Sequence, residues 1–174
     1  MDPAASWRTG DRGQSLVEFA LVLPVLMLIL MGIIQLGILF GAQIGLINGV
    51  REAARFGSLS PTLAANESTN ATAVRDHLAN TVLPGSVIGY SSSNLTSHTA
   101  TYCAYSNPGS GNTYSVRLTV TAVYAHPLFI PFISVILDPI DGTTDSAYTL
   151  STTERFRVEN VPLNNSDITG LATC

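Results

Sequence analysis

The chain has 174 residues, enough for one medium-sized domain, and carries a formal net charge of −4. All eight of its basic residues are arginines, and they are spread along the sequence rather than gathered in one block. Proteins that bind nucleic acids present clustered basic surfaces to the phosphate backbone, so we predict no nucleic-acid partner.

Residues 1–13 form a short polar leader that contains Arg8 and Arg12. Positive charge beside a membrane-spanning segment favours the cytoplasmic side, so we predict an N-terminus inside and a C-terminal part exported across the membrane. The apolar run that follows is longer than that of a secretory signal and shows no A-x-A cleavage site, so we expect the helix to be retained.

The next segment, from Phe19 to Val50, contains no Asp, Glu, Lys, Arg or His. A bilayer-spanning helix needs only about 20 mostly apolar residues, so this run is long enough to cross a membrane. We predict one long helix over residues 14–57, anchored in the lipid bilayer as a single pass. Such a helix is about twice as long as the hydrocarbon layer is thick, so part of it must project from the membrane.

Two features of the helix interior indicate more than anchoring. Pro24 lacks a backbone N–H and is predicted to bend the helix. Gly37, Gly41, Gly45 and Gly49 recur every fourth residue, a spacing that lets another helix backbone approach closely. We predict packing against partner helices along this glycine row, which drifts around the helix by about 40° per step.

The remainder is predicted to be a linker over residues 58–70 and an exported head over residues 71–174. Apolar spacing predicts a short helix over residues 71–82, closed by Leu83-Pro84-Gly85. Alternating apolar residues predict strands, listed here in order of the chain: a weak one over 87–90, a hairpin of 99–105 with 114–125, and a last central strand over 148–158. The fold class is therefore α+β, with a long N-terminal transmembrane helix followed by a small head in which a short helix packs on an antiparallel sheet of three or four strands.

Two cysteines, Cys103 and Cys174, both follow the apolar run. If that side faces an oxidising compartment they could form one disulfide; otherwise both remain unpaired thiols. The sequence leaves these alternatives open.

The segment from Arg12 to Phe19, the Leu23-Pro24 pair and the segment from Arg51 to Gly57 together resemble the N-terminus of the TadE-like family of Tad/Flp pilus assembly, which belongs to the type IV pilin-like proteins. The resemblance implies cleavage by a prepilin peptidase between Gly13 and Gln14. It also implies that Glu18, followed by Phe19, pairs with the N-terminal amine of a neighbouring subunit. Opposite charges in apolar surroundings are stabilising only when they meet, so such a pair would select the register of assembly.

A second similarity concerns the six residues from Asp138 to Thr143, which are identical to the metal-binding segment of inositol monophosphatase-type enzymes. The other acidic segments of that family are absent, so we predict a polar turn. Weak calcium binding by Asp138, Asp141 and Asp145 is the alternative.

We therefore interpret the chain as a membrane-anchored minor pilin or pseudopilin that acts by helix–helix assembly rather than catalysis. Its expected partners are the prepilin peptidase, other pilins or pseudopilins and the Tad secretion platform. No cofactor, metal centre or catalytic residue is predicted, since the three histidines form no nucleophile constellation. The alternative is a single-pass membrane protein whose exported head binds a ligand or a surface partner.

Overall fold

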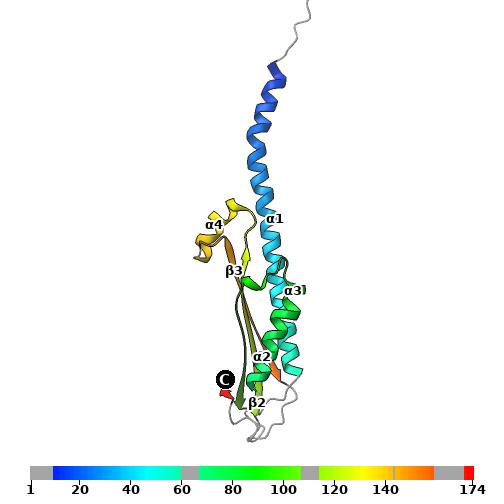
Figure 1. The fold of residues 1–174 in the computed structure, drawn as a ribbon. Coiled ribbons are helices and arrows are strands. Elements are labelled where there is room, and N and C mark those ends of the chain that lie inside the picture. The colour runs from blue at the N-terminus through cyan, green and yellow to red at the C-terminus, as the bar shows by residue number, and fades with distance from the viewer. Residues whose placement is uncertain (1–9, 60–66, 107–113, 143, 159–170) are drawn as a thin grey trace, which may run out of the picture.

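The computed structural model describes residues 10–59, 67–106, 114–142, 144–158 and 171–174. One long helix projects from a head that combines shorter helices with a sheet (Figure 1). The predicted α+β fold class is confirmed. The lower half of the long helix lies along the head and its upper half stands free of it.

Helix α1 spans Gly10–Leu59 and is somewhat longer at both ends than predicted. It runs without interruption through Pro24, so the predicted bend remains a prediction. Gly57 lies inside the helix, where α1 packs closely on the head: a Cβ there would come within 2.5 Å of the Leu118 and Val74 side chains. Within the expected linker, residues 60–66 lie outside the described part of the chain.

The second helical region is longer than predicted and has three parts. Helix α2 (Glu67–His77) continues into a π-helix, η1 (Leu78–Val82), and then into α3 (Leu83–Ser86). The π turn comes just before Pro84, whose ring would clash with the carbonyl four residues earlier in a regular α-helix. Pro84 also has no N–H to offer the Ala79 carbonyl, and the Tyr90 hydroxyl donates to that carbonyl instead, at 2.9 Å. The predicted stop at 83–85 was wrong because the wider turn accommodates the proline.

The sheet has four strands in the order β3-β2-β1-β4. A short 3₁₀ turn, η2 (Ser92–Asn94), leads into β1 (Leu95–Ser106), which pairs antiparallel with β2 (Tyr114–Pro127), as the predicted hairpin requires. β3 (Ala147–Val158) pairs antiparallel with β2 but lies at the edge, so its predicted central place was wrong. The two-residue β4 (Ala172–Thr173) pairs parallel with β1, which makes the sheet mixed rather than purely antiparallel. The predicted strand over 87–90 is a turn.

One face of the sheet packs on α1 and α2 and forms the core. Even-numbered residues of β2 point inward, because successive side chains of a strand alternate between its faces. From α1 the core receives small and branched side chains that let the helix lie close to the sheet. The fully buried core residues include Ala42, Leu46, Val50, Ala53, Ala54, Leu78, Leu83, Val116, Leu118, Val120 and Tyr124.

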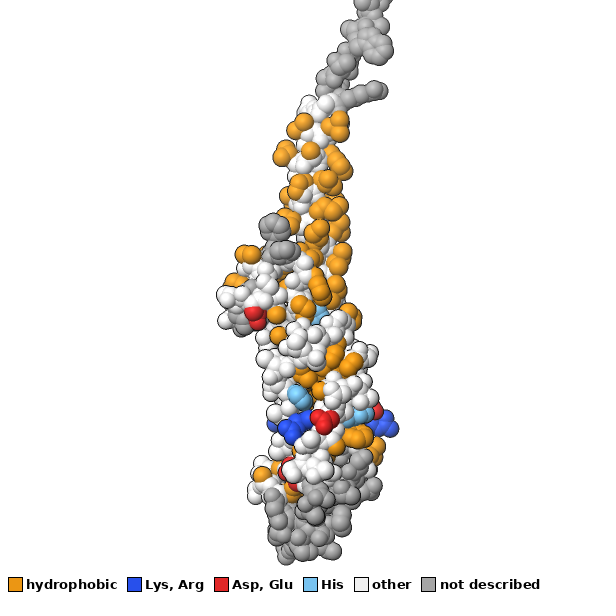
Figure 2. Space-filling model, viewed as in Figure 1, with side chains coloured by type: hydrophobic (Ala, Val, Ile, Leu, Met, Phe, Trp, Pro, Cys, Tyr) orange, Lys and Arg blue, Asp and Glu red, His pale blue; other side chains and the backbone are white. Residues whose placement is uncertain are grey.

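Between β2 and β3 the chain forms helix α4 (Pro131–Asp141), although the two prolines within residues 127–137 favoured a connection there. α4 stands beside α1 at the point where the free half of the long helix begins (Figure 1). In Figure 2, hydrophobic side chains cover the projecting helix, whereas arginines and most of the coloured acidic side chains lie in the lower part of the head.

Candidate functional site

The N-terminal end of α1 presents the residues that the family resemblance singles out. Gly13 lies within the helix, and a Cβ built on it would meet nothing within 4 Å. Glu18 and Phe19 are both exposed. The Glu18 carboxylate accepts a hydrogen bond of 3.3 Å from the Gln14 amide, and in the described part of the chain no cation pairs with it. Glu18 is thus a carboxylate beside an apolar surface with no countercharge from its own described residues.

The free half of α1 has the length of a bilayer. From Gly13 to Ile34 every residue is exposed except Gly32, which is half-buried, and the first buried residue is Gln35. At ~1.5 Å per residue the stretch from Gln14 to Ile34 is roughly 31 Å long, close to the ~30 Å of the hydrocarbon layer. Among the described residues α1 is the one helix long and apolar enough to cross a membrane. The head therefore begins where a membrane-embedded segment would end.

The glycine row lies mainly against the head of the same chain. A Cβ on Gly41 would lie 2.8 Å from the Ile88 side chain, and one on Gly49 would lie 2.8 Å from the Leu83 side chain. At Gly45 a Cβ would collide with the carbonyl oxygen of Ser86. Gly37 has nothing within 4 Å and remains open.

This arrangement corrects the prediction about the partner of the row. The spacing did indicate close backbone approach, but at Gly41, Gly45 and Gly49 the approaching segment is α3 with the residues beside it in the same chain, not a helix of another subunit. Only glycine permits that approach, because Gly45 touches backbone, which cannot rotate away as a side chain can. The row therefore serves to dock α1 on its own head.

Gln35 marks the upper end of the docked half. Its side chain is fully buried, and its Oε1 accepts a hydrogen bond of 3.1 Å from the Phe129 backbone N–H. The Gln35 Nε2 is buried without a hydrogen-bond partner. Lower on α1, the Gln43 amide donates to the Ser151 carbonyl at 3.4 Å. The two glutamines join α1 to the segment before α4 and to β3.

The two cysteines are joined by a disulfide, with Cα atoms 5.1 Å apart. The bond links β1 to β4, and the Cys174 N–H donates to the Ala104 carbonyl at 2.9 Å. The C-terminus is thereby fixed to the edge of the sheet.

The candidate metal ligands are not brought together in what the structure describes. Asp138 and Asp141 belong to the last turns of α4, not to a polar turn, and their side chains lie outside the described atoms. Asp145 accepts a hydrogen bond of 3.1 Å from the Ala147 N–H. The described residues contain no group of three or more possible metal-ligating side chains.

Three buried polar side chains that sequence reasoning did not single out fix the head. The Tyr102 hydroxyl donates to the Gly57 carbonyl at 3.0 Å, and burial, with a smaller effect of the Glu67 carboxylate, raises the pKa of Tyr102 to about 12. The Tyr124 hydroxyl donates to the Gly89 carbonyl at 3.3 Å. The His126 ring is buried and places Nδ1 3.0 Å from the Pro127 carbonyl and Nε2 3.2 Å from the Ile88 carbonyl. Strand alternation places Tyr124 on the apolar face of its strand, but does not indicate which backbone group it meets.

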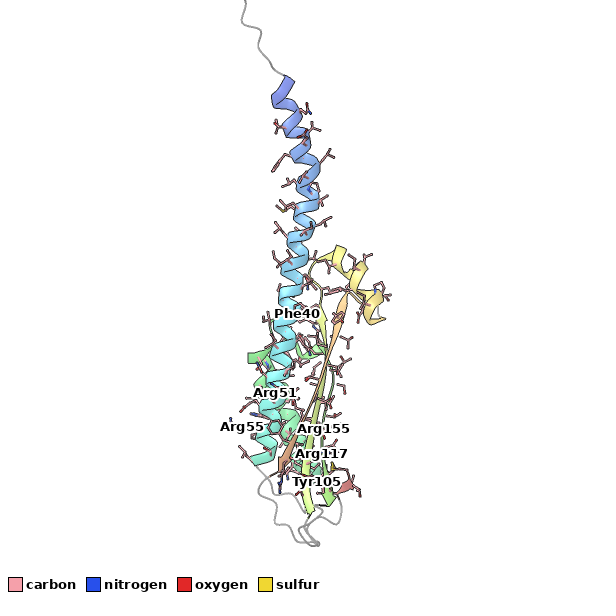
Figure 3. All side chains as sticks on the ribbon, turned by 180° about the vertical axis from the view of Figure 1, so that it is seen from behind. Phe40, Arg51, Arg55, Tyr105, Arg117 and Arg155 are labelled. Carbon is pink, nitrogen blue, oxygen red and sulfur yellow. A yellow bond between two sulfur atoms is a disulfide. The ribbon has the colours of Figure 1, made fainter. Side chains whose placement is uncertain are left out.

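The opposite face of the sheet carries a group of arginines. The strand register places Arg117 opposite Arg157 and Thr119 opposite Arg155 (Arg117 and Arg155 are labelled in Figure 3). Within the described chain none of these three arginines has a carboxylate partner; the salt bridge there joins Arg51 to Glu154 at 2.8 Å on the other face. Arg117 lies 6.0 Å from the centre of the Tyr105 ring, and its Nε is buried without a hydrogen-bond partner.

Comparison with known proteins gives one positive result. The family described as TadE-like protein matches residues 13–55, which is α1 from the predicted cleavage glycine into its docked half. No curated protein and no solved structure matches the chain. The match confirms the resemblance found in the sequence: residues 13–55 are similar to the TadE-like family.

Proposed function

We propose that this chain is a minor pilin or pseudopilin of a Tad-type pilus. A prepilin peptidase removes residues 1–13, the N-terminus stays on the cytoplasmic side of the inner membrane, and the head is exported. The protein then acts through contacts of its free helix with other pilins and with the secretion platform. The observation that carries this proposal is the exposed apolar helix from Gln14 to Ile34, inside the segment that matches the TadE-like family, with Glu18 near its start and no cation beside that carboxylate among the described side chains.

The physical basis is the difference between the two halves of α1. The small residues of the docked half pack against the head, so the free half is the part that other subunits can reach within the bilayer. There, a carboxylate without a countercharge is costly unless a cation meets it. Cleavage after Gly13 would create such a cation, since the new N-terminus at Gln14 carries an amine.

Cleavage provides the first test. The chain is co-expressed with an active prepilin peptidase or with an inactive variant of that peptidase, and the intact mass is measured in membrane extracts. We expect loss of residues 1–13 only with the active enzyme. Retention of the leader with the active enzyme would contradict the pilin function and favour the alternative of a single-pass protein with a binding head.

Co-purification with the other pilins of the same system provides the second test. Glu18→Ala should insert into the membrane as the wild type does but recover less of the partner pilins. Glu52→Ala is the matched control, because it removes an exposed carboxylate from the same helix within the head. Equal recovery by the two variants would count against the role of Glu18.

One observation favours the alternative function, which is that of an exported head that binds an anionic surface partner. Arg117, Arg155 and Arg157 lie on one face of the sheet without carboxylate partners in the described chain. If this face binds a polyanion, Arg155→Ala with Arg157→Ala should elute from heparin at lower salt than Arg51→Ala with Arg75→Ala, which removes the same charge elsewhere. Identical elution would remove this support.

A further inference from the structure

Helix α4 lies at the level where the free half of α1 meets the head. It forms an apolar groove with α1, lined by Leu28, Gly32 and Leu36 on one side and by Ile133, Ile136 and Leu137 on the other. Those α1 residues lie on both sides of Ile34 in the sequence. A segment of bilayer length that begins at Gln14 ends at Ile34. If α1 spans the bilayer, α4 thus lies level with the surface of that membrane on the side of the head.

The outward side of α4 is apolar. Among its described side chains none is charged, and large aliphatic groups face away from the protein. The exposed fractions are 72% for Val135, 65% for Ile136 and 66% for Ile140, and 60% for Phe129 just before the helix. In water this would be a costly surface, whereas at the boundary between headgroups and acyl chains it is favourable.

The same surface continues the lipid-facing surface of α1. Leu28 and Leu36 are exposed on α1 beside the groove, and the exposed apolar residues of α1 extend from there to Leu16. On the face shown in Figure 2, the coloured arginines and most of the coloured acidic side chains lie toward the opposite end of the head. Polarity along the long axis therefore changes at α4, as it does at a membrane surface.

α4 is held in this position by its flanks. The Phe129 N–H is bonded to the buried Gln35 side chain, and the Leu128 N–H donates to the Ser146 carbonyl at 2.9 Å, which closes the loop that carries α4. Leu128 and Ser134 are buried, so the start of the helix is fixed to the head.

We propose that α4, together with Phe129, is an interfacial helix that lies on the outer leaflet of the membrane and sets the depth of the chain in the bilayer. The partner of its exposed apolar side is the lipid surface itself. The inference rests on the proposed membrane anchoring and deepens it, because a head seated on the membrane through a second apolar contact resists withdrawal of α1. This places the protein at the membrane base of the pilus rather than along the filament.

The test uses the full chain in lipid vesicles, with tryptophan as a reporter of depth. Trp7 is the single tryptophan, so a Trp7→Phe background allows one reporter at a time at Ile136→Trp, Ile140→Trp, Leu23→Trp and Thr153→Trp. Lipids brominated near the headgroup end of the acyl chain quench interfacial tryptophans, and lipids brominated deep in the chain quench buried ones. We expect a blue-shifted emission and loss of intensity with the shallow label for the two α4 reporters, and neither for Thr153→Trp on the outer face of the sheet.

The remaining outcomes separate the possible failures. If the α4 reporters behave like Thr153→Trp while Leu23→Trp is quenched by the deep label, the anchor stands and the interfacial helix is refuted. A blue shift without lipid quenching that grows with the protein-to-lipid ratio means that a second copy covers α4, and this too overturns the proposal. Absence of deep quenching at Leu23→Trp would refute the membrane anchor and the inference together.

Discussion

Replacement of Gly45 by alanine tests the docking of α1 on the head. A single methyl group is added where the helix faces the Ser86 carbonyl, and that carbonyl belongs to backbone at the end of α3. α1 and α3 must therefore move apart. Their separation also loosens the neighbouring contacts of Gly41 with Ile88 and of Gly49 with Leu83.

Two opposing terms decide the size of the effect. Alanine is better than glycine inside a helix by about 1 kcal/mol, which favours the variant. Forcing a methyl group into a packed contact costs about 1–3 kcal/mol, and here the obstacle is backbone, so we expect the upper part of that range. Gly45→Ala should thus destabilise the head by about 1–2 kcal/mol net. Gly37→Ala, with nothing within 4 Å, should instead stabilise it by up to about 1 kcal/mol.

The assay compares these two variants with the wild type, as full chains in detergent micelles. Urea unfolding followed by circular dichroism and by tyrosine fluorescence gives the free energies, and thermal unfolding should separate the two variants by about 4–10 °C. The reasoning is refuted if Gly45→Ala is as stable as Gly37→Ala. That result would mean that the α1–α3 distance is not set by the glycine.

Three further changes are expected to alter stability. Burial raises the pKa of Tyr102 from its ordinary 10.0 to about 12, so the unfolded chain loses the phenol proton first. The stability that the buried phenol contributes should be fully present below pH 10 and be lost between pH 10 and 12, and Tyr102→Phe should reduce that loss in urea titrations at several pH values. Cys174→Ser opens a link across a sequence separation of 71 residues and should lower the unfolding free energy by about 2–4 kcal/mol, and a reductant should lower only the wild type to that level. Arg157→Thr removes a like charge opposite Arg117 and should raise the unfolding free energy by about 0.2–1 kcal/mol at low salt, with the gain disappearing at high salt.

The elements with strong local signals could be predicted from the sequence. The uncharged run predicts α1 because it is long and apolar enough for a membrane-spanning helix. The alternation in residues 114–125 and 148–158 predicts two of the three long strands. The turn predicted between β1 and β2 lies in residues 107–113, outside the described part of the chain, but the strands on both sides pair as it requires. The segments Arg12–Phe19, Leu23-Pro24 and Arg51–Gly57 indicated the TadE-like resemblance, which the match over residues 13–55 confirms.

Other features depend on contacts between distant segments and have no local signal. The two-residue β4 exists because the disulfide and the pairing with β1 hold the C-terminus at the sheet edge, not because Ala172 and Thr173 favour a strand. Residues 127–137 were expected to be a connection because Pro127 and Pro131 interrupt them, yet Pro131 occupies the first position of α4, where its missing N–H costs nothing. The partner of the glycine row could not be predicted either, since spacing reveals a close approach but not which backbone approaches.

The division of α1 at Gln35 limits how this chain can contact other subunits. The docked half already presents Gly41, Gly45 and Gly49 to its own head, so another helix cannot use that face unless the head unfolds. In the free half, small residues are few and do not repeat every fourth position, and the surface consists mainly of Leu, Ile, Val and Met side chains. Such a surface attracts other helices in lipid only weakly and lets them slide, because lipid tails are as apolar as the side chains. Under the proposed function, the selection of register must therefore come mainly from Glu18, whose charge is stabilised at one height and at no other.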